Sequence, residues 1–208
     1  MKKAIRGKFI TFEGPEGSGK STQGRLLVKY LRSKGRKAIF LREPGGTSVS
    51  EKIRKILLDK SNHRISPLSE MLLYMAARAQ LVQEIIKPAL ARGYFVVCDR
   101  FLDSTIAYQG YGLGINLSLI EYLGKSVTFS IKPDLTIFLD VEVRRGLRAC
   151  GRKLDRIEQR SLAYHQRVRR GYLTLAAKYP RRIKIVKPDK QKAKTQVEVR
   201  KIIKRYVF

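Results

Sequence analysis

Eight consecutive residues near the start of the chain have the types and spacing to bind phosphate groups. They fit the pattern GxxxxGK[ST] and are Gly14, Pro15, Glu16, Gly17, Ser18, Gly19, Lys20 and Ser21. Glycines let the backbone curl so that successive N–H groups and a helix N-terminus point at one anion. Lys20 can then reach the β and γ phosphates of a nucleotide, and the Ser21 hydroxyl can join the ligands of a Mg²⁺ ion. We therefore predict that these residues, together with Thr22, form a nucleotide-binding turn.

Such a turn occurs in GTPases, motor ATPases, DNA-handling ATPases and small-molecule kinases, so other residues must distinguish among these classes. GTPases normally carry an NKxD-like sequence that reads the base, and this chain has none. Large ATPases usually have a hydrophobic strand that ends in paired acids, whereas here the apolar run at 135–139 is followed by Asp140 and Val141. These features and the length of 208 residues favour a small kinase.

Short apolar runs and amphipathic stretches alternate along the chain and would position this turn. The apolar runs lie at 9–12, 38–41, 95–98, 135–139 and 183–186. Apolar residues at helical spacing occupy 26–31, ended by Gly35, and 71–86, which closes before Gly93. Continuous apolar strands are typical of a sheet that is buried on both faces. We therefore predict an α/β fold with a parallel sheet of about five strands flanked by helices on both faces, in a single domain over 1–208.

Composition excludes several other classes of protein. The chain is 43% hydrophobic and 30% charged, which is typical of a globular domain and not of a wholly disordered chain. No apolar run approaches the roughly 18–20 residues of a membrane span, and the basic start at 1–8 lacks the apolar core and cleavage site of a secretory signal. Cys98 and Cys150 lie far apart and lack metal-binding spacing. We expect a cytoplasmic protein with no membrane partner.

The net charge of +28, from 45 basic and 17 acidic residues, points to an acidic partner. Residues 144–208 hold 22 of the basic residues and only four of the acidic ones. Phosphorylated substrates, nucleic acid or merely solvated helix faces would each account for this excess. The charge therefore leaves a nucleic-acid-binding ATPase open beside the kinase, although a kinase requires no nucleic acid.

The order of the motifs resembles the thymidylate kinase family. The resemblance rests on residues 12–22, 42–47, 76–80, 99–101, 104–105, 107–110, 133–135 and 154–158. These blocks span nearly the whole chain, and together they are highly specific. The resemblance implies a P-loop kinase fold with a short lid, Mg²⁺-dependent phosphoryl transfer from ATP to dTMP to give dTDP, and a homodimer. A kinase of deoxynucleosides, UMP or CMP would lack the Arg-Glu-Pro-Gly-Gly-Thr block at 42–47 together with Gln109.

Three arginines are candidates for phosphate contacts. Arg42 and Arg100 follow the second and third apolar runs, at the sheet edge where open α/β sheets place ligands. An arginine at that edge can grip a phosphate with two parallel hydrogen bonds, which lysine cannot do. The resemblance implies that Arg42, Arg78 and Arg100 surround the monophosphate and the transferring group. Each of them could instead be a salt-bridged surface arginine.

The resemblance also implies which residues hold the nucleoside of the acceptor. Tyr74 stacks on the base, Thr105 lines the base pocket, and Gln109 reads the pyrimidine edge, where its amide can pair with O4 and N3–H. Glu16 accepts a hydrogen bond from the sugar 3′-hydroxyl, which gives a reason for an acid inside a phosphate-binding turn. Tyr74 could instead belong to the core, and Glu16 could be a solvent-facing loop residue.

In the family, a further arginine for the transition state comes either from the phosphate-binding turn or from a flexible lid. The turn has no arginine here, so the resemblance places that role on a lid at about 148–156, with Arg148 and Arg152 as candidates and Arg152 favoured. The lid is slightly shorter than in similar bacterial enzymes. Asp155 and Glu158 either anchor the lid or join the metal ligands.

No nucleophilic Ser, Cys or His constellation accompanies the turn, so we expect direct transfer without a covalent intermediate. His63 and His165 lie far from the turn in sequence, and both are expected at the surface. At 186–189 this chain differs from the family, which more often has an Asp-Ala type turn facing the adenine. The resemblance therefore does not decide which base the phosphate donor carries.

Overall fold

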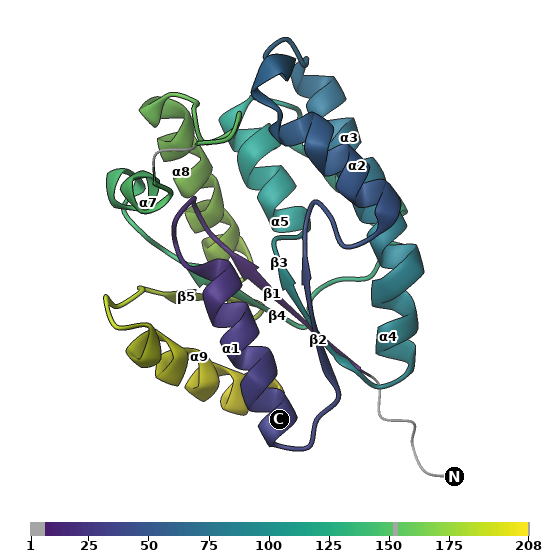
Figure 1. Cartoon of the computed structure of the whole chain (residues 1–208), viewed down its shortest axis with the longest axis vertical. Coiled ribbons are helices and arrows are strands. Elements are labelled where there is room, and N and C mark those ends of the chain that lie inside the picture. The colour runs from purple at the N-terminus through teal and green to yellow at the C-terminus, as the bar shows by residue number, and fades with distance from the viewer. Residues whose placement is uncertain (1–6, 152–153, 208) are drawn as a thin grey trace.

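A computed structural model describes residues 7–151 and 154–207 of the chain. At its centre is a five-stranded parallel sheet with the strand order β2-β3-β1-β4-β5 (Figure 1). The strands are β1 (Lys8–Glu13), β2 (Ala38–Arg42), β3 (Phe95–Asp99), β4 (Leu135–Leu139) and β5 (Ile183–Val186). Each strand matches one apolar run of the sequence to within one residue at either end, so the predicted parallel sheet is confirmed.

Helices connect the strands and cover the sheet. The α-helices are α1 (Lys20–Ser33), α2 (Ser48–Leu58), α3 (Pro67–Leu81), α4 (Lys87–Ala91), α5 (Leu102–Thr105), α6 (Leu117–Val127), α7 (Val143–Ala149), α8 (Leu162–Lys178) and α9 (Lys192–Val207). Other helical turns are the 3₁₀-helix η1 (Lys60–Asn62) and the π-helices η2 (Val82–Ile86) and η3 (Ile106–Gly112).

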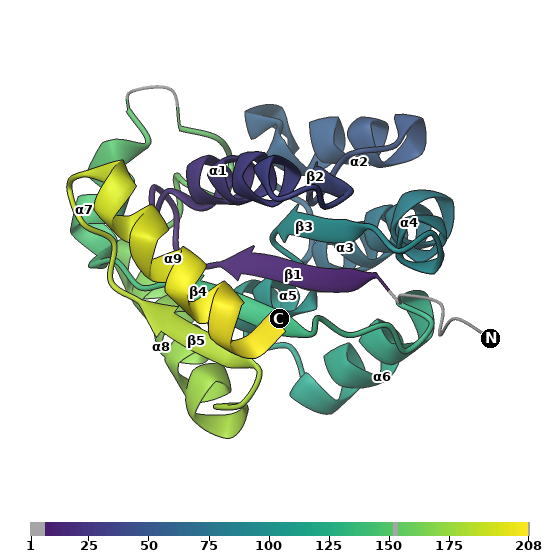
Figure 2. The ribbon, with the colours of Figure 1, turned by 90° about the horizontal axis from the view of Figure 1, so that it is seen from below.

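The two faces of the sheet pack against different helices. On one face α1 and α9 lie together, and Ile10 of β1 packs with Leu27 and Val199 (Figure 2). On the other face Phe9 of β1 packs with α3 and η2, and Phe138 of β4 packs with α8. Neighbouring residues of a strand point to opposite faces, so Phe9 and Ile10 reach different cores. Helices on both faces explain why the strands are continuously apolar.

The helix expected at 71–86 is longer and less regular than its apolar pattern. It starts at Pro67 after Ser66, whose hydroxyl accepts a hydrogen bond from the Ser69 N–H. After α3 the chain continues through η2 and α4 to Ala91, and so ends before Gly93, as predicted. The second π-helix, η3, follows α5 and was not predicted. Wide turns of this kind are frequent at functional sites.

The two cysteines are free thiols that lie on different elements. Cys98 is buried in β3, and Cys150 is half-buried just after α7. No helix in the described part of the chain is long and apolar enough to cross a membrane.

Candidate active site

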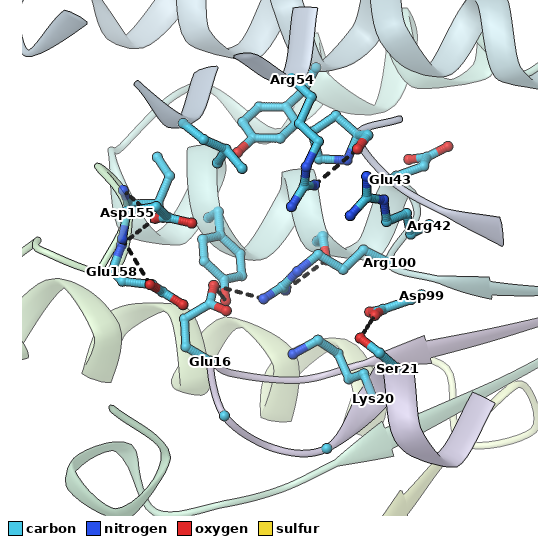
Figure 3. Close-up of a pocket in the computed structure, with 18 of the residues that line it drawn as sticks. Glu16, Lys20, Ser21, Arg42, Glu43, Arg54, Asp99, Arg100, Asp155 and Glu158 are labelled. Carbon is cyan, nitrogen blue, oxygen red and sulfur yellow. Dashed lines mark hydrogen bonds and ion pairs between the residues drawn. The ribbon is translucent and has the colours of Figure 1, made fainter. Parts of the chain in front are cut away.

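The carboxyl ends of β1, β2 and β3 open into one cavity of about 550 Å³ (Figure 3). Parallel strands end at the same edge of a sheet, so the loops that follow them gather there. The candidate residues that line the cavity are Glu16, Gly17, Gly19, Lys20, Ser21, Thr22, Arg42, Tyr74, Arg78, Arg100, Thr105 and Gln109. The structure therefore brings the glycine-rich turn and the arginine-bearing strand ends into one cavity.

The shape of the turn between β1 and α1 requires glycine. Gly14 and Gly17 have φ angles of +142° and +66°, which L side chains rarely adopt. A Cβ atom on Gly17 would collide with the carbonyl oxygen of Gly146 in α7. Pro15 and Ser18 are buried in the turn behind the cavity. The turn is thus a compact backbone cradle that rests against α7.

Lys20 is buried at the first position of α1. Its Nζ donates a hydrogen bond to the Pro15 carbonyl at 2.7 Å and another to the Ser18 hydroxyl at 3.3 Å. Burial and the positive charge of Arg100 lower the pKa of Lys20 to about 8, although nearby acids oppose this shift. A phosphate bound in the turn would favour the charged ammonium.

Arg100 is held firmly at the end of β3. Its backbone is left-handed, with φ at +71°, and its Nη1 and Nη2 donate to the Gly14 carbonyl at 3.1 Å and to Glu16 Oε1 at 2.7 Å. The guanidinium lies 4.8 Å from the centre of the Tyr108 ring, and the Tyr108 hydroxyl donates to the same Glu16 oxygen at 2.8 Å. Burial would raise the pKa of Glu16, but the charges of Arg100 and Lys20 lower it to about 2. Glu16 is therefore a fixed anion and not a solvent-facing loop residue.

A buried acid that was not predicted from the sequence supports the loop that carries Arg100. Glu13 accepts hydrogen bonds from the Phe101 N–H at 2.7 Å, the Ser104 hydroxyl at 2.6 Å and the Tyr172 hydroxyl at 3.0 Å. Burial raises the pKa of Glu13 to about 8. These contacts tie the end of β1 to α5 and α8 behind the cavity.

The β2 side of the cavity is more open. The Arg42 side chain is 48% exposed and forms an ion pair with Glu51 at 3.1 Å. The same carboxylate accepts the Gly46 N–H at 2.9 Å. Arg54 of α2 also lines the cavity and donates to the Pro44 carbonyl at 3.0 Å (Figure 3). Arg54 was not predicted, although its position three residues after Glu51 places both on one face of the helix.

Arg78 is a buried arginine, with only 2% of its side chain exposed. Its Nε donates to the Glu43 carboxylate at 2.7 Å, its Nη1 to the Thr105 hydroxyl at 3.0 Å, and its Nη2 to the Phe101 carbonyl at 3.0 Å. Burial raises the pKa of Glu43 to about 7, although the charge of Arg78 opposes this shift. Arg78 is thus ion-paired but not at the surface, and a ligand would have to share its donors.

Two further candidates for nucleoside contacts lie on α3 and η3. Tyr74 is half-buried and lines the cavity one helical turn before Arg78, so it belongs to the cavity wall. Gln109 is almost completely buried, and its Nε2 donates to the carboxylate of Glu70 at 2.9 Å. The π-helical turn η3 carries Gln109 to the cavity.

A hydroxyl and a carboxylate beside the turn have the chemistry of metal ligands. The Ser21 hydroxyl donates to Oδ2 of Asp99, and both residues line the cavity (Figure 3). Oδ1 of Asp99 is buried and has no hydrogen-bond partner among the described residues. Hard oxygen donors, completed by phosphate oxygens and water, are the ligands that Mg²⁺ prefers. The residues present therefore fit a Mg²⁺ ion.

The segment expected to form the lid lies only partly within the described residues. Arg152, the favoured lid arginine, lies outside them. Arg148 is exposed on α7, and the cavity lining does not include it. Asp155 accepts the Glu158 N–H at 2.9 Å, and Glu158 accepts the Asp155 N–H at 2.9 Å. These reciprocal bonds anchor the end of the segment, and both acids line the cavity.

His63 is exposed as expected, but the expectation for His165 is wrong. His165 is 1% exposed and packs edge-to-face on Tyr164, with ring centres 5.2 Å apart. Burial lowers the pKa of His165. Its burial depends on tertiary packing, which its sequence position does not indicate.

Comparisons with known proteins find relatives of this chain in one family. A family model described as Thymidylate kinase matches residues 12–199. A thymidylate kinase of Citrifermentans bemidjiense is 52% identical over 188 residues, which cover 86% of this chain and 84% of that protein. One of an Exiguobacterium species is 49% identical over 198 residues, which cover 94% and 93%.

A solved structure gives the same relationship in three dimensions. The crystal structure of thymidylate kinase from Ehrlichia chaffeensis matches this chain with a TM-score of 0.80 and 36% sequence identity. The match covers 96% of this chain and 99% of that one. Because the family model spans most of the chain and the relatives match nearly end to end, the chain belongs to the thymidylate kinase family.

Proposed function

We propose that this chain transfers the γ-phosphoryl group of ATP to dTMP and so forms dTDP for dTTP synthesis, as befits an enzyme of the thymidylate kinase family. The observation that carries the proposal is the single cavity lined by Lys20 of the turn and by Arg100 and Gln109 beyond it. A kinase must hold its donor and its acceptor within reach of each other, and a shared cavity meets that requirement.

On the donor side, the backbone N–H groups of residues 14–19 and the start of α1 bind the phosphates of ATP. Lys20 binds the β and γ phosphates, which favour its charged form. Ser21 and Asp99 would hold a Mg²⁺ ion. When bound, that ion supplies positive charge at the donor phosphates.

On the acceptor side, Arg100 and Arg42 bind the phosphate of dTMP, and Arg100 needs little reordering because Glu16 already holds it. Glu16 also accepts a hydrogen bond from the sugar 3′-hydroxyl. The thymine ring stacks on Tyr74 and meets the amide of Gln109. Thr105 lines the base pocket, and Arg78 joins Arg42 and Arg100 around the monophosphate.

The transfer proceeds directly between the two nucleotides. An oxygen of the dTMP phosphate attacks the γ-phosphorus, the bond to the bridging oxygen of the β phosphate breaks, and ADP leaves. A phosphate monoester has its second pKa at about 6, so the attacking group is ionised at neutral pH and needs no side-chain base. All of these residues belong to a single domain over 1–208. Arg148 or Arg152, in a lid at 148–156, adds positive charge near the transferring phosphoryl group in the transition state. We also propose that the enzyme is a homodimer, as the family resemblance implies, and that it works in the cytoplasm, where its two free cysteines stay reduced.

Parallel turnover assays test this function. ATP consumption and product formation are measured with dTMP, dUMP, UMP, CMP and single-stranded DNA, and we expect efficient turnover with dTMP and no dependence on DNA. Lys20→Ala should abolish transfer because the donor phosphates lose their cation, while its circular dichroism spectrum should match that of the wild type. ATP hydrolysis stimulated by DNA without dTDP formation would instead favour a nucleic-acid-dependent ATPase.

A further inference from the structure

Glu70 is a fully buried acid beside the cavity that the proposed reaction does not use. It lies in the first turn of α3 and has no exposed surface. Its Oε2 accepts a hydrogen bond from Arg160 Nη2 at 2.7 Å and pairs with Arg156 Nη2, also at 2.7 Å. Its Oε1 accepts a hydrogen bond from Gln109 Nε2 at 2.9 Å. Two guanidinium groups thus offset the burial of one carboxylate, whose remaining oxygen faces Gln109.

The two arginines are themselves fixed, so the direction of the Glu70 carboxylate is fixed as well. Arg156 is buried, and its Nε donates to a backbone carbonyl of α2 at 2.8 Å. Arg160 Nη1 donates to the Tyr164 hydroxyl at 2.8 Å, and its guanidinium lies 4.7 Å from the centre of that ring. Two side chains from the loop before α8 and one from η3 therefore meet at one carboxylate of α3.

This contact decides which way the amide of Gln109 faces. A carboxylate only accepts hydrogen bonds, so the amide must turn its NH₂ group toward Glu70 and cannot turn its carbonyl there. The carbonyl oxygen and the second N–H of Gln109 are left for a ligand, so the positions of this acceptor and this donor are fixed. Thymine and uracil offer a donor at N3 and an acceptor at position 4, whereas cytosine offers the reverse, which only a flipped amide would match.

We propose that Glu70 is a positioning residue that fixes the Gln109 amide in the orientation that accepts thymine or uracil and rejects cytosine. Arg156 and Arg160 act one step further away, because they hold Glu70 in place. The inference rests on the proposed function, since it requires that Gln109 meets the base of the acceptor nucleotide.

The test is a mutant cycle of Glu70→Gln, Gln109→Leu and the double variant. For each protein, kcat/KM is measured with dTMP and with dCMP, and the Kd of each nucleotide is measured by calorimetry. Because a glutamine at position 70 can both donate and accept, Gln109 can flip, and the preference for dTMP over dCMP should fall about tenfold. In the Gln109→Leu background, Glu70→Gln should leave that preference unchanged. Glu121→Gln removes an exposed carboxylate paired with Lys178 at 3.3 Å, and this charge-matched control should keep the wild-type preference.

A purely structural role for Glu70 predicts a different result. Glu70→Gln would then lower the melting temperature and weaken both nucleotides equally, and an unchanged preference would overturn the inference. If Glu70→Gln does not fold, adding Arg160→Met removes one cation along with the carboxylate, and the preference for dTMP over dCMP is measured in that double variant.

A crystal structure of the wild type with dTMP tests the inference without any substitution, because a Gln109 amide turned away from Glu70 would overturn it. A wild type that does not use dTMP overturns the proposed function, whereas an active wild type with an unchanged preference in Glu70→Gln overturns only this inference.

Discussion

Arg100 and Arg42 lie at the ends of neighbouring strands but in opposite environments. The pairing of β2 with β3 aligns Arg42 with Asp99, the residue before Arg100. The Arg100 side chain is 16% exposed and is bound to the partly buried carboxylate of Glu16 (Figure 3). The Arg42 side chain is 48% exposed and pairs with the exposed Glu51. Exposed ion pairs are screened by water and hold a side chain only weakly. We infer that the β3 side of the cavity is ordered before substrate binds, and that the β2 side becomes ordered on binding.

This contrast separates two ways in which an arginine can serve one reaction. A side chain that is already in place contributes most when charge develops in the transition state, because no reorganisation is needed at that moment. A side chain that must be ordered by the substrate contributes mainly to binding. Substitutions on the β3 side should therefore change kcat and folding stability, and those on the β2 side should change KM.

The largest effect is expected from Arg100→Ala. Loss of the fixed guanidinium should lower kcat roughly a thousandfold, with a smaller change in KM. The fold should also lose about 1–3 kcal/mol, because Glu16 keeps its place without its main partner. Arg100→Lys retains the charge but not the two-pronged geometry, so most of the loss in kcat should persist. Steady-state kinetics decide the point, and a kcat close to that of the wild type would refute the fixed role of Arg100.

The next effect concerns the stability of the buried ion pair that joins the two sides of the cavity. Arg78→Met leaves the buried Glu43 carboxyl without its partner, and an unsatisfied buried group of this kind typically costs about 1–3 kcal/mol. Urea unfolding at neutral pH measures it. The double variant with Glu43→Leu removes both charges and should recover much of the loss. If Arg78→Met unfolds at the wild-type urea concentration, the buried pair does not stabilise the cavity wall.

Arg42→Ala should act on binding alone. We expect the KM for dTMP to rise about tenfold, with kcat near the wild-type value and stability changed by less than about 0.5 kcal/mol. Lys52→Ala on the exposed face of α2 is the control and should match the wild type. A large loss of kcat in Arg42→Ala would show that both sides of the cavity are fixed in the same way.

The smallest effect is a shift in the pH dependence of ATP binding. Charged Lys20 binds phosphate, so the affinity for ATP should fall as the pH rises above about 8, the pKa of Lys20 in the free protein. Arg100→Ala removes a neighbouring positive charge, which should raise the pKa of Lys20 and move the fall to higher pH. Arg42→Ala should leave the profile in place. Calorimetric titrations across the alkaline range report it, and identical profiles for all three proteins would exclude the coupling between Lys20 and Arg100.

Features that depend on local sequence could be predicted. The five strands were predictable because each is a continuous apolar run, and the turn because its glycines and Lys20 stand at a fixed spacing. Arg42 and Arg100 could be placed near each other because parallel strands end at one edge of the sheet. Local patterns therefore predict the sheet and the positions of Arg42 and Arg100 at its edge.

Features that depend on distant partners could not be predicted. Glu70 meets Arg160 across 90 positions of sequence, and Glu13 meets Tyr172 across 159. No spacing rule links residues so far apart, because the pairing exists only once the helices have packed. The strand order and the π-helical turn that carries Gln109 to the cavity likewise depend on tertiary packing rather than on apolar periodicity.

A crystal structure of the protein with dTMP and a non-hydrolysable ATP analogue tests most directly whether one cavity joins the two nucleotides. We expect an oxygen of the dTMP phosphate within about 3–3.5 Å of the γ-phosphorus, with Lys20 on the donor phosphates and Arg100 on the acceptor phosphate. Two nucleotides in separate sites, or a dTMP phosphate bound away from Arg100, would contradict the account.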